Sequence, residues 1–146
     1  MSPSDYQRSV MKHEGLHWLQ EQTIPGINAR LDWWLVEGWP DYIGESRTQA
    51  ALVNALCRNE IPTFKQMVDG PGADPNMAPE RVSQFYAYAN TMVEYLYATF
   101  RKDVYWDLLA AYKDTVDPQL TYPKVLGVTP PQFYAGWLAF AKKKYC

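Results

Sequence analysis

The sequence has 146 residues, 47% of them hydrophobic and 15% aromatic, and a chain of this size can bury one core rather than two. Its 14 basic and 16 acidic residues leave a formal charge of −2, so it lacks the excess of basic residues by which proteins bind nucleic acids and acidic membranes. No apolar run reaches the roughly 18 residues of a membrane span, and the N-terminus lacks the layout of a signal peptide. We therefore expect a single domain over residues 1–146, with no nucleic-acid partner and no membrane span.

The first half of the chain predicts two long helices and a loop. Ser2 as the N-cap, with a proline next to it, opens a helix from about residue 3 to about residue 22, which ends before a Pro-Gly pair. A second helix opens near Trp34 to Glu37 and runs to about Cys57, and Pro40 fits it only within the first turn. Residues 59–79 contain four prolines and two glycines, which predicts a long ordered loop with at most one short helical turn around residues 63–67.

The second half predicts further helices. Pro79 starts the clearest one, with apolar residues spaced by three and four up to Phe100. Residues 104–114 form another, Gly127 closes a short segment, and Thr129 caps a last helix that ends in a solvated lysine run. No stretch between turn signals shows sustained alternation of polar and apolar residues, so we expect an all-α fold of about five to six helices.

The two cysteines carry no metal-ligand spacing. Cys57 and Cys146 are far apart in the sequence and do not form a framework of several bridges. We expect two unpaired thiols, with Cys57 as a small buried apolar residue. A single bridge between them is the alternative.

A metal-binding pattern lies within the first predicted helix. The segment His13-Glu14-Gly15-Leu16-His17 matches H-E-x-x-H and contains both histidines of the chain. Residues four apart share one face of a helix, so both imidazoles can reach one zinc ion at roughly 2.0–2.1 Å. Glu14, about 100° further round the helix, points beside the metal and can hold the attacking water. The alternative is an exposed helix face that binds nothing.

Zinc needs a third protein ligand. The metzincin extension requires glycine and histidine where this chain has Gln20 and Thr23, which excludes that class. Glu21 lies a further turn along the same helix, too far to complete a tetrahedron with both histidines. Glu37 is the better candidate, because the Pro25-Gly26 break lets the second helix turn back towards the first.

A second motif resembles a known family. The segment Trp34-Leu35-Val36-Glu37-Gly38-Trp39-Pro40-Asp41-Tyr42 resembles the second-helix motif of gluzincin zinc metallopeptidases, in particular the peptidase MA-like group, with the pattern W-L-x-E-G-x-A-[ED]-Y. The resemblance implies that Glu37 is the third ligand and that Asp41 orients a zinc-binding histidine, as in thermolysin-like enzymes. Pro40 replaces the usual alanine, which we expect to affect helix geometry more than ligation. Weaker likeness downstream extends the resemblance over most of the chain.

The resemblance implies a peptidase mechanism with one zinc ion, in which Glu14 is the general base. Thermolysin-like enzymes stabilise the oxyanion with a further histidine, and none is left here. We expect Tyr86 or Tyr88 to be the donor instead, and Arg47 is the second choice. Four tryptophans lie near the motifs in sequence, and we expect them to be core residues rather than substrate contacts: Trp18, Trp33, Trp34 and Trp39.

Gluzincins commonly place a substrate-binding β-sheet before the H-E-x-x-H helix, and this chain enters the helix directly. We expect a zincin-like helical subdomain that forms the C-terminal part of a longer catalytic unit, secreted or membrane-anchored if an upstream region directs it. The predicted function is a zinc metallopeptidase acting on a peptide or protein substrate. The alternatives are a non-catalytic, zinc-stabilised helical interaction domain and a hydrolase of a non-peptide amide.

Overall fold

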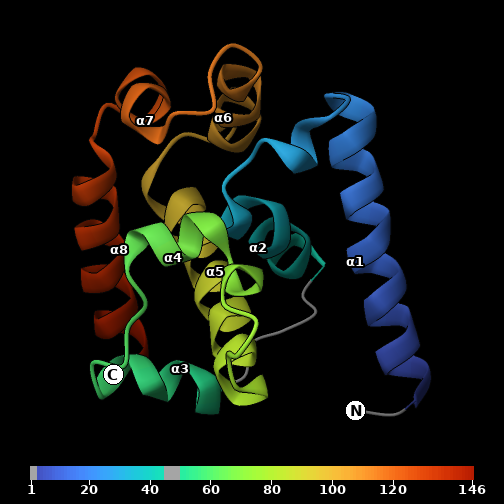
Figure 1. Cartoon of the computed structure of the whole chain (residues 1–146), viewed down its shortest axis with the longest axis vertical. Coiled ribbons are helices and arrows are strands. Elements are labelled where there is room, and N and C mark those ends of the chain that lie inside the picture. The colour runs from blue at the N-terminus through green and yellow to red at the C-terminus, as the bar shows by residue number, and fades with distance from the viewer. Residues whose placement is uncertain (1–2, 45–49) are drawn as a thin grey trace.

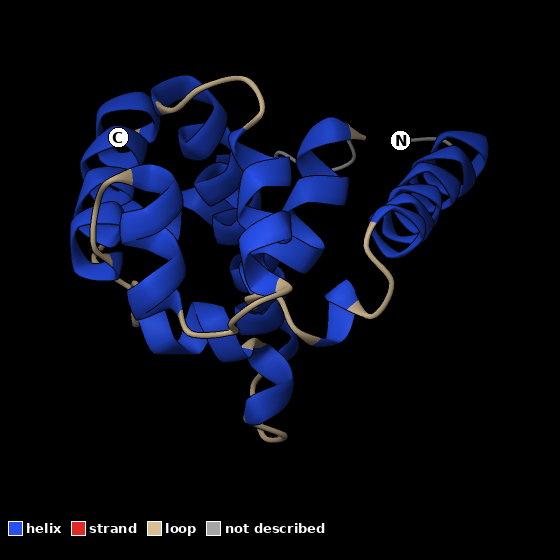
Figure 2. Cartoon of the chain, turned by 90° about the horizontal axis from the view of Figure 1, so that it is seen from above, coloured by secondary structure: helices blue, strands red, loops and turns tan. Residues whose placement is uncertain are grey.

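The fold consists of helices throughout the described residues. The structure is a computed structural model that describes residues 3–44 and 50–146. These ranges contain eight α-helices, two short 3-10 helices and no strand, which confirms the all-α class (Figures 1 and 2). The elements are α1 (Pro3–Thr23), η1 (Ile27–Ala29), α2 (Trp33–Ile43), α3 (Ala50–Cys57), α4 (Phe64–Asp69), η2 (Pro71–Ala73), α5 (Pro79–Thr99), α6 (Val104–Tyr112), α7 (Pro118–Leu126) and α8 (Pro130–Tyr145). None of the described helices is both long and apolar enough to cross a bilayer.

Helix α1 carries the H-E-x-x-H segment and lies at the edge of the molecule. It begins at Pro3, as predicted, whereas the cap predicted at Ser2 lies outside the described residues. Beyond its end, Gly26 adopts a φ of 81°, a left-handed conformation that glycine reaches without steric cost. The chain then reverses through η1, so that α1 packs mainly against α2 and η1 and stands beside the other helices (Figures 1 and 2).

Helix α2 is shorter than predicted, and its proline lies deeper. The helix expected to reach Cys57 ends at Ile43 and is closed by Gly44, and α3 is a separate helix. Pro40 was expected in the first turn, but it lies beyond the second turn of α2. Because proline has no N–H, the carbonyl of Val36, four residues earlier, loses its usual helical donor.

The position of α2 is fixed at its middle and at its start. A Cβ added at Gly38 would lie 2.4 Å from the carbonyl oxygen of Ala89, so α2 and α5 approach backbone to backbone there. Just before α2, the buried Asp32 accepts 2.6 Å hydrogen bonds from the hydroxyls of Tyr112 on α6 and Tyr122 on α7. These contacts hold the helix that presents the predicted third ligand.

The segment rich in proline and glycine contains more helix than the single short turn predicted around residues 63–67. It contains one short helix, α4, which begins with a capping box between Thr63 and Gln66, and the 3-10 helix η2. Downstream, Gly127 ends α7 with a φ of 71°, and Thr129 caps α8 as predicted. The structure has more helices than the five to six expected, because α4 is helical and the predicted helix to Cys57 ends early.

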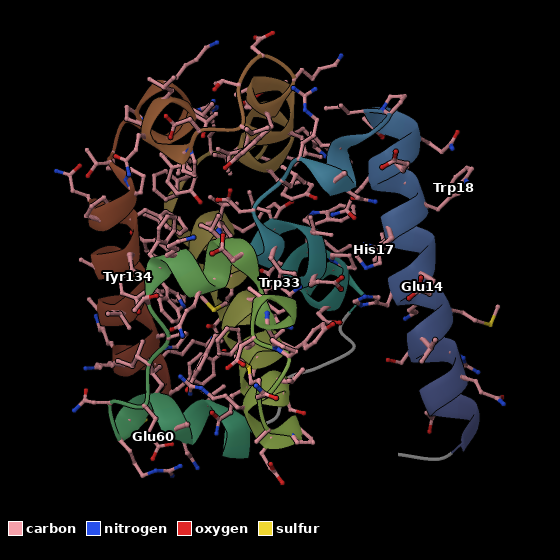
Figure 3. All side chains as sticks on the ribbon, in the orientation of Figure 1. Glu14, His17, Trp18, Trp33, Glu60 and Tyr134 are labelled. Carbon is pink, nitrogen blue, oxygen red and sulfur yellow. A yellow bond between two sulfur atoms is a disulfide. The ribbon has the colours of Figure 1, made fainter. Side chains whose placement is uncertain are left out.

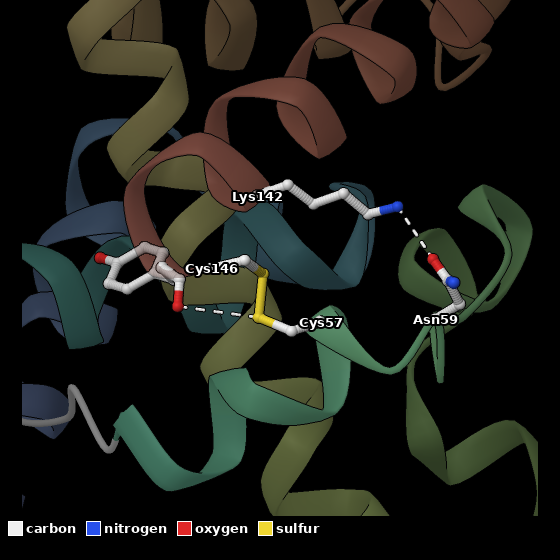
Figure 4. Close-up of a disulfide and its surroundings, with 5 residues drawn as sticks. Cys57, Asn59, Lys142 and Cys146 are labelled. Carbon is white, nitrogen blue, oxygen red and sulfur yellow. Dashed lines mark hydrogen bonds between the residues drawn. A yellow bond between two sulfur atoms is a disulfide. The ribbon is translucent and has the colours of Figure 1, made fainter.

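The cysteines are paired, contrary to our expectation. Cys57 at the end of α3 and Cys146 after α8 form a disulfide with a Cα–Cα distance of 5.7 Å across 89 residues of sequence (Figure 4). Cys57 is exposed rather than buried. Nearby, Lys142 donates a 2.9 Å hydrogen bond to Asn59. Helices α3 and α8 pack together, and this tertiary contact is what brings the two thiols within reach.

Candidate metal centre

Three side chains from two helices converge between α1 and α2. The Nε2 atoms of His13 and His17 lie 2.8 Å apart, and each lies 3.1 Å from Oε2 of Glu37. One donor atom from each residue lies within 4.8 Å of the others. The structure therefore brings together the three residues predicted as metal ligands.

The outer nitrogen of each histidine has a hydrogen-bond partner. Nδ1 of His13 lies 2.7 Å from Oδ1 of Asp41, which is buried and lies one turn after Glu37 on α2. The structure thus places Asp41 where the motif predicted it. Nδ1 of His17 lies 3.0 Å from Oε1 of Gln20, a residue that the sequence marks only as a departure from the metzincin pattern. Gln20 lies three residues after His17 on the same helix face, and this spacing was the signal that could have predicted the contact.

The cluster shifts the pKa values of its members. The hydrogen bond to Asp41, followed by that to Glu37, raises the pKa of His13 to about 9. Burial lowers the pKa of His17, but the hydrogen bond and the charge of Glu37 outweigh it, so the net shift is upward. Burial raises the pKa of Glu37, but hydrogen bonds from the two histidines bring it down to about 2. Without a metal, the cluster is therefore a proton-sharing ion pair, and a cation that binds there must displace protons.

Glu14 lies beside the triad on the solvent side. It is exposed and makes no hydrogen bond or ion pair within the described residues. In Figure 3, His17 points from α1 towards α2, while Trp18 points away from the other helices. Trp18 was expected in the core, but 63% of it is exposed, so this expectation is wrong.

The other three tryptophans lie inside the helical body. Trp34 and Trp39 are buried, as expected. Trp33 is half-buried at the start of α2, where its ring packs against Gly70 and edge-on against Tyr86 at 5.0 Å. Trp33 lies one turn before Glu37, so the pair of Trp33 and Tyr86 lies beside the face of α2 that carries Glu37.

The structure separates the two tyrosines proposed as oxyanion donors. Tyr86 stays a candidate, because it packs against Trp33 at the start of α2. Tyr88 is fully buried, and its hydroxyl donates a 3.1 Å hydrogen bond to the carbonyl of Glu60. Glu60 lies on the opposite side of the molecule from Glu14 and His17 (Figure 3), so Tyr88 is not brought to the triad. Arg47 lies outside the described residues.

The donor set fits zinc. Two imidazole nitrogens and one carboxylate oxygen are typical of catalytic zinc sites, in which a fourth position stays open. The partners on the outer nitrogens leave both Nε2 lone pairs for a cation. Comparisons with protein-family models, with curated proteins and with solved structures find no match for this chain. Any assignment of function therefore rests on the motifs and on this geometry.

Proposed function

We propose that this chain is a gluzincin-type, zinc-dependent metallopeptidase that hydrolyses peptide bonds in a peptide or protein substrate. His13, His17 and Glu37 hold one zinc ion, and the helices correspond to the helical subdomain of a zincin-like catalytic unit. The observation that carries the proposal is the convergence of the two Nε2 atoms on one oxygen of Glu37, with Asp41 behind His13.

The surrounding residues suit this reaction. When bound, zinc polarises the scissile carbonyl and acidifies water. Glu14 accepts a proton from the attacking water and passes it to the leaving amine, a role for which its solvent-exposed carboxylate is accessible. Asp41 holds the ring of His13 with Nε2 turned inward. Tyr86 is the candidate donor for the oxyanion.

The substitution Glu14→Gln tests the proposal. Its zinc content should equal that of the unchanged chain, because Glu14 is not a ligand, while peptide hydrolysis should fall by about 10²–10⁴-fold with the loss of the base. Both proteins are loaded with one equivalent of zinc and assayed with a mixed fluorogenic peptide library. Glu80→Gln is the matched control, because Glu80 is an exposed glutamate on α5. Equal hydrolysis by the unchanged chain and by Glu14→Gln would refute a peptidase that uses this base.

A second candidate function is a zinc-stabilised interaction domain without catalysis. It is favoured by the apolar side chains that α1 turns to solvent, since Met11 is 75% and Trp18 is 63% exposed, and exposed apolar groups mark interaction surfaces. In this case chelation should lower the melting temperature, and zinc-loaded protein should hydrolyse no peptide. Zinc-dependent hydrolysis that disappears in Glu14→Gln would rule this candidate out.

A further inference from the structure

Gln20 joins three helices beside the predicted metal ligands. It lies on α1 and is fully buried. Its Oε1 faces Nδ1 of His17 at 3.0 Å, and its Nε2 lies 3.3 Å from the carbonyl oxygen of Val36 on α2 and 2.6 Å from the hydroxyl of Tyr105 on α6. Both ends of the amide group are therefore engaged.

The carbonyl of Val36 fixes which end of the amide faces His17. A main-chain carbonyl can only accept a hydrogen bond, so the NH₂ group of Gln20 must face it and the amide oxygen must face the imidazole. The second amide hydrogen is donated to the hydroxyl of Tyr105. Because an amide oxygen also only accepts, Nδ1 of His17 must carry a hydrogen. In a neutral ring this leaves the lone pair on Nε2, the atom that faces Glu37.

Pro40 explains why the carbonyl of Val36 accepts from another helix. In a regular α-helix this oxygen would accept from the N–H of residue 40, and proline has none. Gln20 supplies the missing donor from α1. Pro40 is also the position at which the chain departs from the motif it resembles. The departure therefore has a consequence at the ligand His17.

Tyr105 holds the other side of the amide. Its ring stacks on Trp39 with a centroid distance of 4.7 Å and an interplanar angle of 5°. Trp39 is itself fixed by a 3.0 Å hydrogen bond from its Nε1 to the hydroxyl of Tyr97. The acceptor that Gln20 uses is thus part of the rigid aromatic core, which leaves the amide little freedom to rotate.

We infer that Pro40, the Val36 carbonyl, Gln20 and Tyr105 act together to hold His17 with its hydrogen on Nδ1 and its Nε2 lone pair towards the metal. The inference rests on the proposed function, because it concerns the same zinc site. Gln20 is a positioning residue, since it contacts a ligand rather than the metal or the substrate. A carboxylate at this position would place an oxygen without a hydrogen against the Val36 carbonyl. The partner of Nδ1 in His17 is therefore an amide, whereas the partner of Nδ1 in His13 is the carboxylate of Asp41.

The first test measures the tautomer of His17 in the metal-free protein. Long-range ¹H–¹⁵N spectra are recorded up to about pH 10, so that the neutral ring is observed. The unchanged chain should carry the hydrogen on Nδ1. Gln20→Leu should move it to Nε2, and Gln22→Leu, an exposed glutamine on the same helix, should leave it in place. A hydrogen on Nε2 in the unchanged chain would overturn the inference, whether or not the protein binds zinc.

The second test measures zinc affinity by competition with a chromophoric chelator. Gln20→Leu should weaken binding by about 10–100-fold, as is typical when the partner of a ligand is lost, and Gln22→Leu should not weaken it. Affinity in Gln20→Leu equal to that of the control would contradict the inference.

Pro40→Ala separates positioning from stability. It restores an N–H that competes with Gln20 for the Val36 carbonyl and removes an interior proline. We therefore expect a higher melting temperature of the metal-free chain together with several-fold weaker zinc binding. Unchanged or tighter binding would contradict the inference. An unchanged chain with the hydrogen on Nδ1 that binds no zinc would instead refute the proposed function and still support the positioning of His17.

Discussion

Raising the pH from about 7 to about 9 should strengthen zinc binding, because His13 holds a proton in the metal-free chain. Its pKa is raised from 6.5 to about 9, first by the hydrogen bond to Asp41 and then by that to Glu37. Zinc needs the lone pair on Nε2, so this proton must leave when the metal binds. The pKa of His17 is also raised, and its proton adds to the effect in the same direction.

The size of the effect follows from the pKa of His13. At about pH 7 the ring is about two pH units below its midpoint, and removing the proton costs about 2.7 kcal/mol, which is ~100-fold in apparent zinc affinity. The affinity should therefore rise by about tenfold for each pH unit up to about pH 9 and then level off. His13 is largely buried, with 16% of its side chain exposed, so solvent screens this interaction only in part.

The same shifts set the pH dependence of the metal-free fold. The raised pKa of His13 stabilises the fold fully below about pH 6.5, and this contribution is lost as the pH rises through about 9. The lowered pKa of Glu37 stabilises the fold above about pH 4.5, and this contribution is lost as the pH falls through about 2. The cluster therefore stabilises the metal-free chain most between about pH 4.5 and pH 6.5, whereas zinc binding is favoured at higher pH.

Calorimetry can measure the released protons directly. Zinc is titrated at about pH 7 in two buffers with different ionisation enthalpies, and we expect about one proton or more to leave per zinc ion. Asp41→Asn removes the largest cause of the raised pKa of His13. It should weaken binding at high pH and flatten the dependence between about pH 7 and pH 9. Proton release near zero, or an affinity that does not change over this range, would show that His13 does not hold a proton in the metal-free cluster.

Three further predictions concern the scaffold. Replacing Cys57 and Cys146 by serine opens a bridge across 89 residues, and chain entropy alone predicts a loss of about 4.5 kcal/mol in the free energy of unfolding. Urea denaturation measures this loss, zinc affinity should stay unchanged, and an unaltered midpoint would contradict the bridge. Gly15→Ala should stabilise α1 by about 0.5–1 kcal/mol because nothing lies within 4 Å of the added Cβ. Gly38→Ala should destabilise the fold by about 1–3 kcal/mol or more because its Cβ would clash with the α5 backbone, and thermal unfolding that ranks the two variants in the opposite order would refute this.

The convergence of the candidate metal ligands could be predicted because their signals are local. His13 and His17 are four residues apart, and helix geometry alone places them on one face. Glu37 needed one more step, the reversal of the chain at Pro25-Gly26, which the sequence also marks. The structure places all three donor atoms within 4.8 Å of one another, and Asp41 follows from Glu37 by one helical turn.

The features that the sequence did not predict depend on contacts between distant helices. The bridge between Cys57 and Cys146 requires α3 and α8 to pack together, and no local pattern encodes that contact. The tyrosine pair is a different case. Residues two apart on a helix point about 200° apart, so Tyr86 and Tyr88 could never both have faced one zinc ion. The structure shows which of them is turned away, since Tyr88 bonds to the carbonyl of Glu60.

Pro40 shows how a departure from a motif can act at a distance. From the sequence, the proline was expected to affect the geometry of α2 more than ligation. A proline inside a helix leaves one carbonyl without its helical donor, and that carbonyl can accept a hydrogen bond from elsewhere. That donor is Gln20 on α1, and the opposite end of the same amide faces His17. The sequence contains Pro40, Gln20 and His17 but does not show that they act together, because their contacts form only when α1 lies against α2. Because Pro40 leaves the Val36 carbonyl without its helical donor and Gln20 donates to that carbonyl, we expect substitutions at these two positions to be non-additive in zinc affinity.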